Sequence, residues 1–153
     1  MKTYFFLFLI FIFSYTSFGQ NAQNEKLVKH VVLAFQKDFN EGGFKNAKRY
    51  TTSDWQHINP GGGITKGREE VLKEVRAVHK TFLNGVSISI ESIEIRFLST
   101  TVAIANVVHK SSEYELPQGV KHQNERQMKT YIIVKRQNKW LLRLDQNTII
   151  AGH

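Results

Sequence analysis

The sequence predicts an α+β fold, in which three N-terminal helices pack on a curved, mostly antiparallel sheet. Two observations lead to this prediction. Apolar residues recur at helical spacing in the first half of the chain, where residues 55–59 form the one strand, and from residue 86 onward the apolar period changes to two. A curved sheet after helices can wrap around them and enclose a pocket between the two layers.

The three helices are delimited by capping residues and glycines. The first is predicted from Glu25 to about Phe39, with Asn24 as its cap and Gly42-Gly43 after its end. The second covers residues 44–49. The third has Gly67 as its cap and runs to about Phe82, before Asn84-Gly85. Their apolar stripes are Val28, Val31, Phe35 and Phe39 in the first helix, and Leu72, Val75, His79 and Phe82 in the third. Each stripe gives its helix one face that can pack on the sheet.

The strands follow from alternation. Their predicted spans are residues 55–59, 86–97 with a bulge near Glu91-Ser92, 101–109, 127–136 and 139–148. Residues 111–125 form a long hairpin connection, and Gln137-Asn138 joins the last two strands. The last four strands are therefore expected to form a meander.

The first 19 residues have the order of a signal peptide. Lys2 is positive, residues 4–15 are apolar, and Ser17-Phe18-Gly19 offers small residues to a signal peptidase. The apolar run is shorter than the roughly 20 residues of a spanning helix. We therefore expect cleavage before Gln20, export to the periplasm or the medium, and no stable membrane insertion afterwards. An uncleaved anchor and a buried N-terminal helix are the alternatives.

Composition limits the remaining chain, residues 20–153, to a single domain that relies on its own core. There is no cysteine, which excludes disulfides and thiolate metal sites. The net charge of the whole 153-residue chain is +8, but the basic residues are scattered and do not alternate with aromatics. This pattern is typical of a solvated basic surface and does not indicate a nucleic-acid partner.

Candidate site residues lie on the first strand, where Trp55, His57 and Asn59 alternate onto one face. If that face is concave, the His57 imidazole lies in the pocket and suits acid–base catalysis. Trp55 would form an apolar wall and Asn59 would bind a polar group of the ligand. A hydrogen-bonded structural role for His57 is the alternative.

Three further ligand-binding candidates come from other elements: His79 of the third helix, His109 at the end of the strand that carries Ala103 and Ala105, and Gln146 of the last strand. His79 could equally be a core histidine. Gln146 shares a face with Trp140 and Leu142, so it is expected to point inward.

The same alternation sends Asp145 outward, to an ion pair with Arg143 or Arg126 at the surface or at a dimer interface. No histidine pair has metal-ligand spacing and no Gly-rich dinucleotide fingerprint follows a strand. Neither a metal nor a cofactor is therefore expected.

Several segments together resemble the SnoaL-like group of the nuclear transport factor 2-like (cone-fold) superfamily, and within it the SgcJ/EcaC oxidoreductase-type subgroup. The matching residues are Trp55-x-His57-x-Asn59, Gly63-x-x-x-Gly67-Arg68-Glu69-Glu70-Val71, His79, residues 97–105, Lys139-Trp140 and Gln146-Asn147-Thr148. The resemblance implies a cone-shaped half-barrel with a deep pocket, and a homodimer packed sheet to sheet. Apolar residues such as Ile88, Ile90, Ile132 and Val134 would form that interface.

The resemblance leaves the activity open among three hypotheses. SnoaL-type cyclases carry an Asp acid–base beyond the last strand, where this chain has Thr148-Ile149-Ile150-Ala151 without a carboxylate. This departure favours a pocket that binds a small, largely apolar molecule. The alternatives are an isomerase, cyclase or oxidoreductase-like enzyme with His57 as acid–base, and a dimeric interaction scaffold without a ligand.

Overall fold

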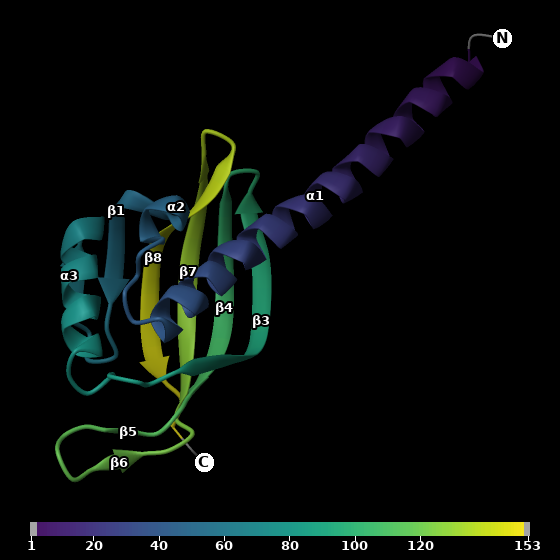
Figure 1. Ribbon diagram of the computed structural model, residues 1–153. Helices are drawn as coiled ribbons and strands as arrows, with labels where there is room; N and C mark the ends of the chain where they lie inside the picture. The colour runs from purple at the N-terminus through teal and green to yellow at the C-terminus, as the bar shows by residue number, and fades with distance from the viewer. Residues whose placement is uncertain (1–2, 152–153) are drawn as a thin grey trace.

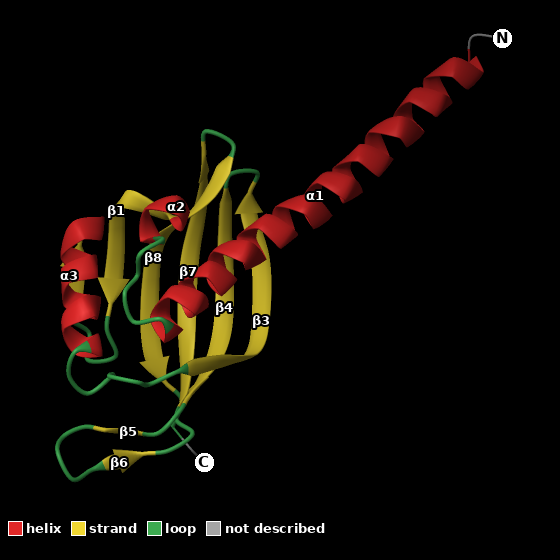
Figure 2. Cartoon of the chain, in the orientation of Figure 1, coloured by secondary structure: helices red, strands yellow, loops and turns green. Residues whose placement is uncertain are grey.

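The computed structural model describes the backbone of residues 3–151 and the side chains of residues 21–151. Its helices are α1 (Thr3–Asn40), α2 (Ala47–Tyr50) and α3 (Arg68–His79). Its strands are β1 (Thr51–Ile58), β2 (Ile64–Lys66), β3 (Ile88–Ser99), β4 (Val102–Ser111), β5 (Tyr114–Glu115), β6 (Lys121–His122), β7 (Arg126–Arg136) and β8 (Lys139–Ile149). Figures 1 and 2 show α1 crossing one face of a curved sheet, with α3 at the β1 side.

The main sheet has six strands in the order β2-β1-β8-β7-β4-β3. β3, β4, β7 and β8 are antiparallel neighbours, which confirms the predicted meander. β1 pairs in parallel with β8, so the first strand of the chain lies beside the last. The α+β half-barrel with a mostly antiparallel sheet is confirmed.

The core lies between α1 and the concave face of the sheet. The predicted face of α1 is buried, with Val28 at 0% and Phe35 at 2% exposure. From the sheet come Trp55, Ala103, Ala105, Val107, Tyr131, Ile133 and Leu142, each at 0% exposure. These side chains form the hydrophobic core.

The N-terminal helix differs from the sequence prediction at its start. α1 begins at Thr3, so Asn24 is an interior residue and not a cap. Asn24 Oδ1 instead accepts hydrogen bonds from Trp140 Nε1 at 3.0 Å and Lys135 Nζ at 3.4 Å. The side chains of the expected signal segment, residues 1–19, and of Gln20 lie outside the described part, so cleavage stays a prediction. Among the described residues, no helix combines the length and apolarity needed to cross a membrane.

Two helix boundaries were also placed wrongly. α2 begins at Ala47 and not at Phe44, because Phe44 has a φ of 48°, which no right-handed helix accommodates. α3 begins after the predicted Gly67 cap but ends at His79. The next turn tightens, with Thr81 N–H bonded to the Val78 carbonyl three residues back, so Phe82 lies beyond the helix.

Bulges in two strands change which side chains face the core. The register of β3 shifts between Ile90 and Ser92, as predicted. The register of β8 shifts as well: Ile133 pairs with Leu142 and Ile132 with Leu144, so Arg143 is the extra residue. A bulge reverses the alternation beyond it. This second bulge was not predicted.

The expected dimer face mixes two sides of the sheet. Ile90 packs against the core on the concave side, and Ile88 shares its side of the strand. Ile132 and Val134 alternate with the buried Tyr131 and Ile133, so they lie on the convex side. Only the second pair can contribute to an interface between convex faces.

Candidate functional site

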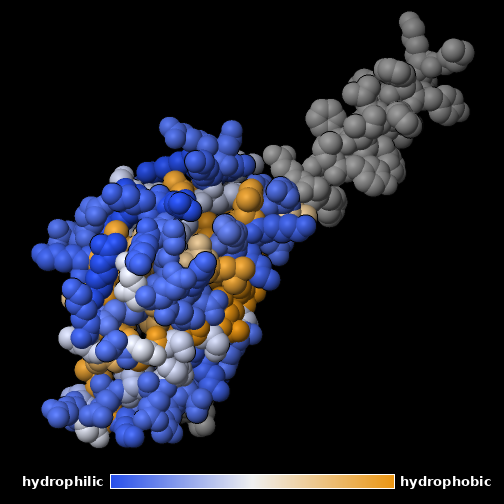
Figure 3. All heavy atoms as spheres, in the orientation of Figure 1, coloured by the Kyte–Doolittle hydropathy of each residue, from blue (hydrophilic) through white to orange (hydrophobic). Residues whose placement is uncertain are grey.

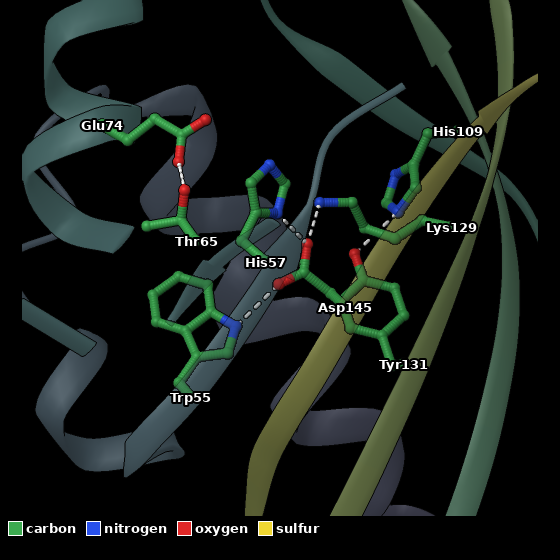
Figure 4. A network of polar contacts seen from close by, with 8 residues as sticks. All are labelled: Trp55, His57, Thr65, Glu74, His109, Lys129, Tyr131 and Asp145. Atoms are coloured by element: carbon green, nitrogen blue, oxygen red, sulfur yellow. Dashed lines mark hydrogen bonds and ion pairs between the residues drawn. The ribbon is translucent and has the colours of Figure 1, made fainter. Parts of the chain in front are cut away.

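A fully buried carboxylate, Asp145 of β8, is the centre of the candidate site (Figure 4). Asp145 Oδ1 accepts a hydrogen bond from Trp55 Nε1 at 2.7 Å. Asp145 Oδ2 lies 2.7 Å from His57 Nδ1 and 2.7 Å from Lys129 Nζ. Trp55 and His57 come from β1 and Lys129 from β7. Side chains from two strands therefore converge on a carboxyl group that a third strand carries.

Strand pairing explains this convergence. Trp55 and His57 lie two residues apart and so share a face of β1. The parallel ladder places His57 opposite Asp145, and the antiparallel ladder places Tyr131 opposite Asp145 on the other side. Lys129 is two residues from Tyr131 on the same face.

The expected orientation of the last strand was wrong. Asp145 is 0% exposed, whereas Gln146 is exposed to solvent. The cause is the bulge at Arg143, which puts Leu142 and Asp145 on the same side of β8. The Arg143 guanidinium itself contacts Asp54 Oδ2 of β1 at 3.2 Å.

Asp145 is held as a carboxylate. Burial by itself raises the pKa of this carboxyl group, but the Lys129 ammonium and the His57 ring outweigh burial and hold the pKa below its ordinary value. The carboxylate and the ammonium form an ion pair with both side chains at 7% exposure or less. Buried charges persist only when they are paired in this way.

The ionised Asp145 determines the tautomer of His57. A carboxylate only accepts hydrogen bonds, so His57 Nδ1 must carry the proton between them. In the neutral imidazole the lone pair then lies on Nε2. Figure 4 shows the second ring nitrogen pointing away from Asp145. The side chain is 10% exposed.

The edge strand β2 closes the site beside His57. Thr65 lies opposite His57 in the β1–β2 ladder. Its hydroxyl donates a hydrogen bond to Glu74 of α3 (Figure 4). This contact ties the edge of the sheet to the helix next to the histidine.

Lys129 is enclosed by aromatic rings. Its Nζ lies 4.2 Å from the ring centroid of Phe35 on α1 and 5.7 Å from that of Tyr131. The ammonium lies over both rings, and the negative face of an aromatic ring attracts a cation. Lys129 is the least expected member of the site, because an alternating β7 segment gave no reason to single out a lysine.

The predicted ligand residue His109 lies next to this group. Its Nε2 is 3.0 Å from Tyr131 Oη, and the residue is 4% exposed. Burial, and then the charge of Lys129, lower the pKa of His109 to about 3. Burial and the Asp145 charge raise the pKa of Tyr131 well above its ordinary value. Both groups are therefore neutral at physiological pH.

The other two predicted ligand residues make structural bonds. His79 Nδ1 lies 2.7 Å from the Val75 carbonyl and Nε2 lies 3.0 Å from the Phe39 carbonyl, so the ring ties α3 to α1. Asn59 Oδ1 accepts from the amides of Gly61 and Gly63, each at 3.0 Å, and closes the Gly-rich turn. The structure thus gathers Trp55, His57 and His109, and separates them from His79, Asn59 and Gln146.

Two surface clefts lie away from this cluster, and each has a volume of about 520 Å³. One lies between the ends of α1 and α3 and includes His79, Arg76 and Lys80. The other lies between α1, α2 and the β7–β8 turn. None of the residues that bind Asp145 lines either cleft. Within the described range, no group of three His, Cys, Asp or Glu side chains could hold a metal ion.

Comparison with known proteins shows the fold of this chain. No protein-family model and no curated protein matches this chain. An uncharacterised protein with a cystatin-like fold from Caulobacter vibrioides superimposes with a TM-score of 0.79 at 20% identity, over 85% of this chain and 92% of that one. A ketosteroid isomerase-like protein from Erwinia carotovora atroseptica has a TM-score of 0.68 at 16% identity, over 83% of this chain and 96% of that one. A hexachlorocyclohexane dehydrochlorinase has a TM-score of 0.67 at 13% identity, over 88% of this chain and 93% of that one.

These neighbours show the fold of the chain. The chain has the cystatin-like cone fold of the nuclear transport factor 2-like proteins. The fold that the SnoaL-like resemblance implied is confirmed. Because one fold serves many activities, the function must be argued from the Asp145 site.

Proposed function

We propose that the protein catalyses proton transfer on a small organic molecule, with His57 as the acid–base and Asp145 as the carboxylate that orients it. The observation that carries the proposal is the 2.7 Å contact between His57 Nδ1 and Asp145 Oδ2 at a position that is 0% exposed. A carboxylate bonded to one imidazole nitrogen leaves the other nitrogen as the base and stabilises the imidazolium that forms.

Trp55 and Lys129 support the same role from the other sides of Asp145. The Trp55 indole N–H occupies Oδ1, and Lys129 shares Oδ2 with His57. Both contacts favour the ionised carboxylate, so Asp145 is a poor acceptor for the proton and remains the partner of the ring. Residues 148–151 contain no carboxylate acid–base, and in this proposal the His57 ring takes that role while Asp145 orients it.

The names of two structural neighbours are compatible with a reaction of this class. One is described as ketosteroid isomerase-like and one as a dehydrochlorinase. Loss of hydrogen chloride requires a base that takes a proton, and many isomerisations move one. The identities of 16% and 13% carry the fold alone, so the reaction class rests on the geometry of His57.

The test is solvent-deuterium incorporation into a panel of small carbonyl compounds with acidic C–H bonds, followed by proton NMR in D2O. We expect exchange with at least one compound, and His57→Gln to reduce its rate by about 10²- to 10⁴-fold because the general base is lost. His30→Gln is the matched control, since His30 is exposed on α1. Equal rates in wild-type and His57→Gln protein contradict the proposal. Binding of panel members without any exchange would favour a non-catalytic pocket protein.

We also propose that the protein is a homodimer through its convex sheet face. Val102, Ile104, Ile132, Val134 and Leu144 are half-buried there and form an apolar surface across β4, β7 and β8. Figure 3 shows the opposite side of the molecule, which is mostly hydrophilic apart from a hydrophobic strip beside α1. Large apolar patches on a soluble domain commonly mark an interface.

Light scattering at micromolar concentration is expected to give twice the mass of one chain. Ile132→Lys should shift the protein to monomer, because it places a charge in the centre of the apolar face. Thr130→Lys, at the polar end of the same strand face, is the control. A wild-type monomer at this concentration would contradict the proposed dimer.

A further inference from the structure

Three polar groups on the concave face have hydrogen-bonding capacity that the described residues do not use. His109 Nδ1 and Asn147 Oδ1 are buried and have no hydrogen-bond partner. The Lys129 ammonium has three N–H groups, and Asp145 is the hydrogen-bond acceptor that the described residues provide. Buried polar groups without partners are rare in native proteins, because each one is destabilising. Such a group therefore needs a specific explanation.

The three groups lie on adjacent strands. Lys129 of β7 is paired with Val107 of β4 on one side and with Asn147 of β8 on the other. His109 is two residues beyond Val107 and so shares its face. The His109 and Tyr131 rings lie 6.2 Å apart, and Lys129 Nζ lies 5.7 Å from the same Tyr131 ring. Figure 4 shows His109 and Lys129 on the same side of the sheet.

The Tyr131 contact determines what His109 offers. Both groups are neutral, and the described residues give the Tyr131 hydroxyl no acceptor other than His109 Nε2. If the phenol donates, Nε2 is used as an acceptor and Nδ1 carries the proton. In the reverse arrangement His109 Nε2–H donates to Tyr131 Oη. The phenol O–H then has no acceptor, and His109 Nδ1 has no donor. The first arrangement leaves fewer groups unpaired, so His109 Nδ1 is a hydrogen-bond donor.

We infer that Lys129, His109 and Asn147 form a subsite for a neutral, oxygen-bearing group of the ligand, a carbonyl or a hydroxyl. Lys129 and His109 supply donors to its oxygen, and Asn147 Oδ1 accepts from its hydroxyl. This inference rests on the proposed function, because it names the substrate class of the same site.

Charge excludes the other classes of ligand. The Lys129–Asp145 pair is already neutral, so an anion would compete with Asp145 for the ammonium and face its carboxylate. A cation would be repelled by Lys129. A hydrocarbon would leave His109 Nδ1 and Asn147 Oδ1 without hydrogen-bond partners.

The subsite is close enough to His57 to act in the same reaction. Lys129 Nζ and His57 Nδ1 bond the same oxygen of Asp145, each at 2.7 Å. A carbonyl oxygen held at Lys129 therefore lies beside the His57 ring. When His57 takes a proton from the neighbouring carbon, the C–H electron pair moves into the carbonyl and the oxygen becomes negative. The Lys129 and His109 donors stabilise that charge, and return of the proton from His57 restores the neutral molecule.

The test uses four probes that share one ring: cyclopentanone, cyclopentanol, cyclopentane and cyclopentanecarboxylate. Affinities are measured by NMR titration, with the imidazole ¹⁵N signals of His109 as a local reporter. We expect the ketone and the alcohol to bind about tenfold more tightly than the hydrocarbon and the carboxylate, and to shift the His109 signals. Asn147→Leu should weaken the alcohol about fivefold to tenfold and leave the ketone unchanged, because only the hydroxyl donates to Asn147. Asn106→Leu, on the convex face of β4, is the matched control and should change neither.

Equal binding of all four probes, preference for the carboxylate, or unmoved His109 signals would overturn the subsite. Unmoved His109 signals would indicate that these atoms bind only an ordered water. Titrations are repeated with the His57→Gln protein, which lacks the proposed base. The probe preferences persist there if the subsite is real. Deuterium exchange that depends on His57 without any probe preference would uphold the proposed function and reject the subsite.

Discussion

Asp145→Ala is expected to lower the free energy of unfolding by about 3–5 kcal/mol, because it leaves the Lys129 ammonium buried without a counter-charge. The Trp55 indole N–H loses its acceptor in the same substitution, and a buried donor without a partner is itself destabilising. Urea unfolding at pH 7, followed by circular dichroism, measures the change.

Two matched variants separate the ion pair from other effects. Asp54→Ala removes the neighbouring carboxylate that pairs with Arg136 and Arg143, but its side chain is 47% exposed. Exposed pairs contribute about 0–1 kcal/mol, so this variant should remain close to wild type. The double variant Asp145→Ala with Lys129→Met should be more stable than Asp145→Ala alone, since it removes the unpaired charge. Equal stability of the Asp145→Ala and Asp54→Ala proteins would show that the buried pair does not contribute.

The stability of the protein is expected to fall as the pH decreases below about 6.5, because His109 resists protonation in the fold. Its folded pKa of about 3 lies below the ordinary histidine value of about 6.5. Between these values the unfolded chain binds a proton at His109 that the folded chain does not. Stability then changes by about 1.4 kcal/mol per pH unit, and it is fully present only above the unfolded pKa.

Urea unfolding between pH 7.5 and pH 5 measures this slope while ordinary carboxylates stay ionised. The Asp145 carboxylate, whose pKa is also lowered, adds its own loss of stability only below about pH 4. His109→Phe should flatten the profile between pH 6.5 and pH 5, whereas His30→Phe, on the exposed face of α1, should leave the slope unchanged. An identical slope in the His109→Phe protein would assign the effect to another group.

Local patterns of the sequence were sufficient for much of the fold. The burial of Val28 and Phe35 on one face of α1 was predictable, because helical spacing is visible in a short stretch of sequence. The bulge near Glu91 is also visible locally, since the apolar residues on either side of it change parity. The same reasoning placed Trp55 and His57 together, because two residues of one strand share a face without reference to any partner.

Only the tertiary structure decided which residue Trp55 and His57 contact. The sequence of β8 shows no sign of a bulge, and strict alternation along it predicted that Asp145 points outward. The bulge at Arg143, next to its contact with Asp54 of β1, reverses the alternation and turns Asp145 inward. The parallel pairing of β1 with β8 then places His57 against Asp145 across 88 residues of chain. Strand register and pairing depend on contacts between distant segments, so the sequence determined the cone and the face of His57, and the folded sheet determined the carboxylate that orients it.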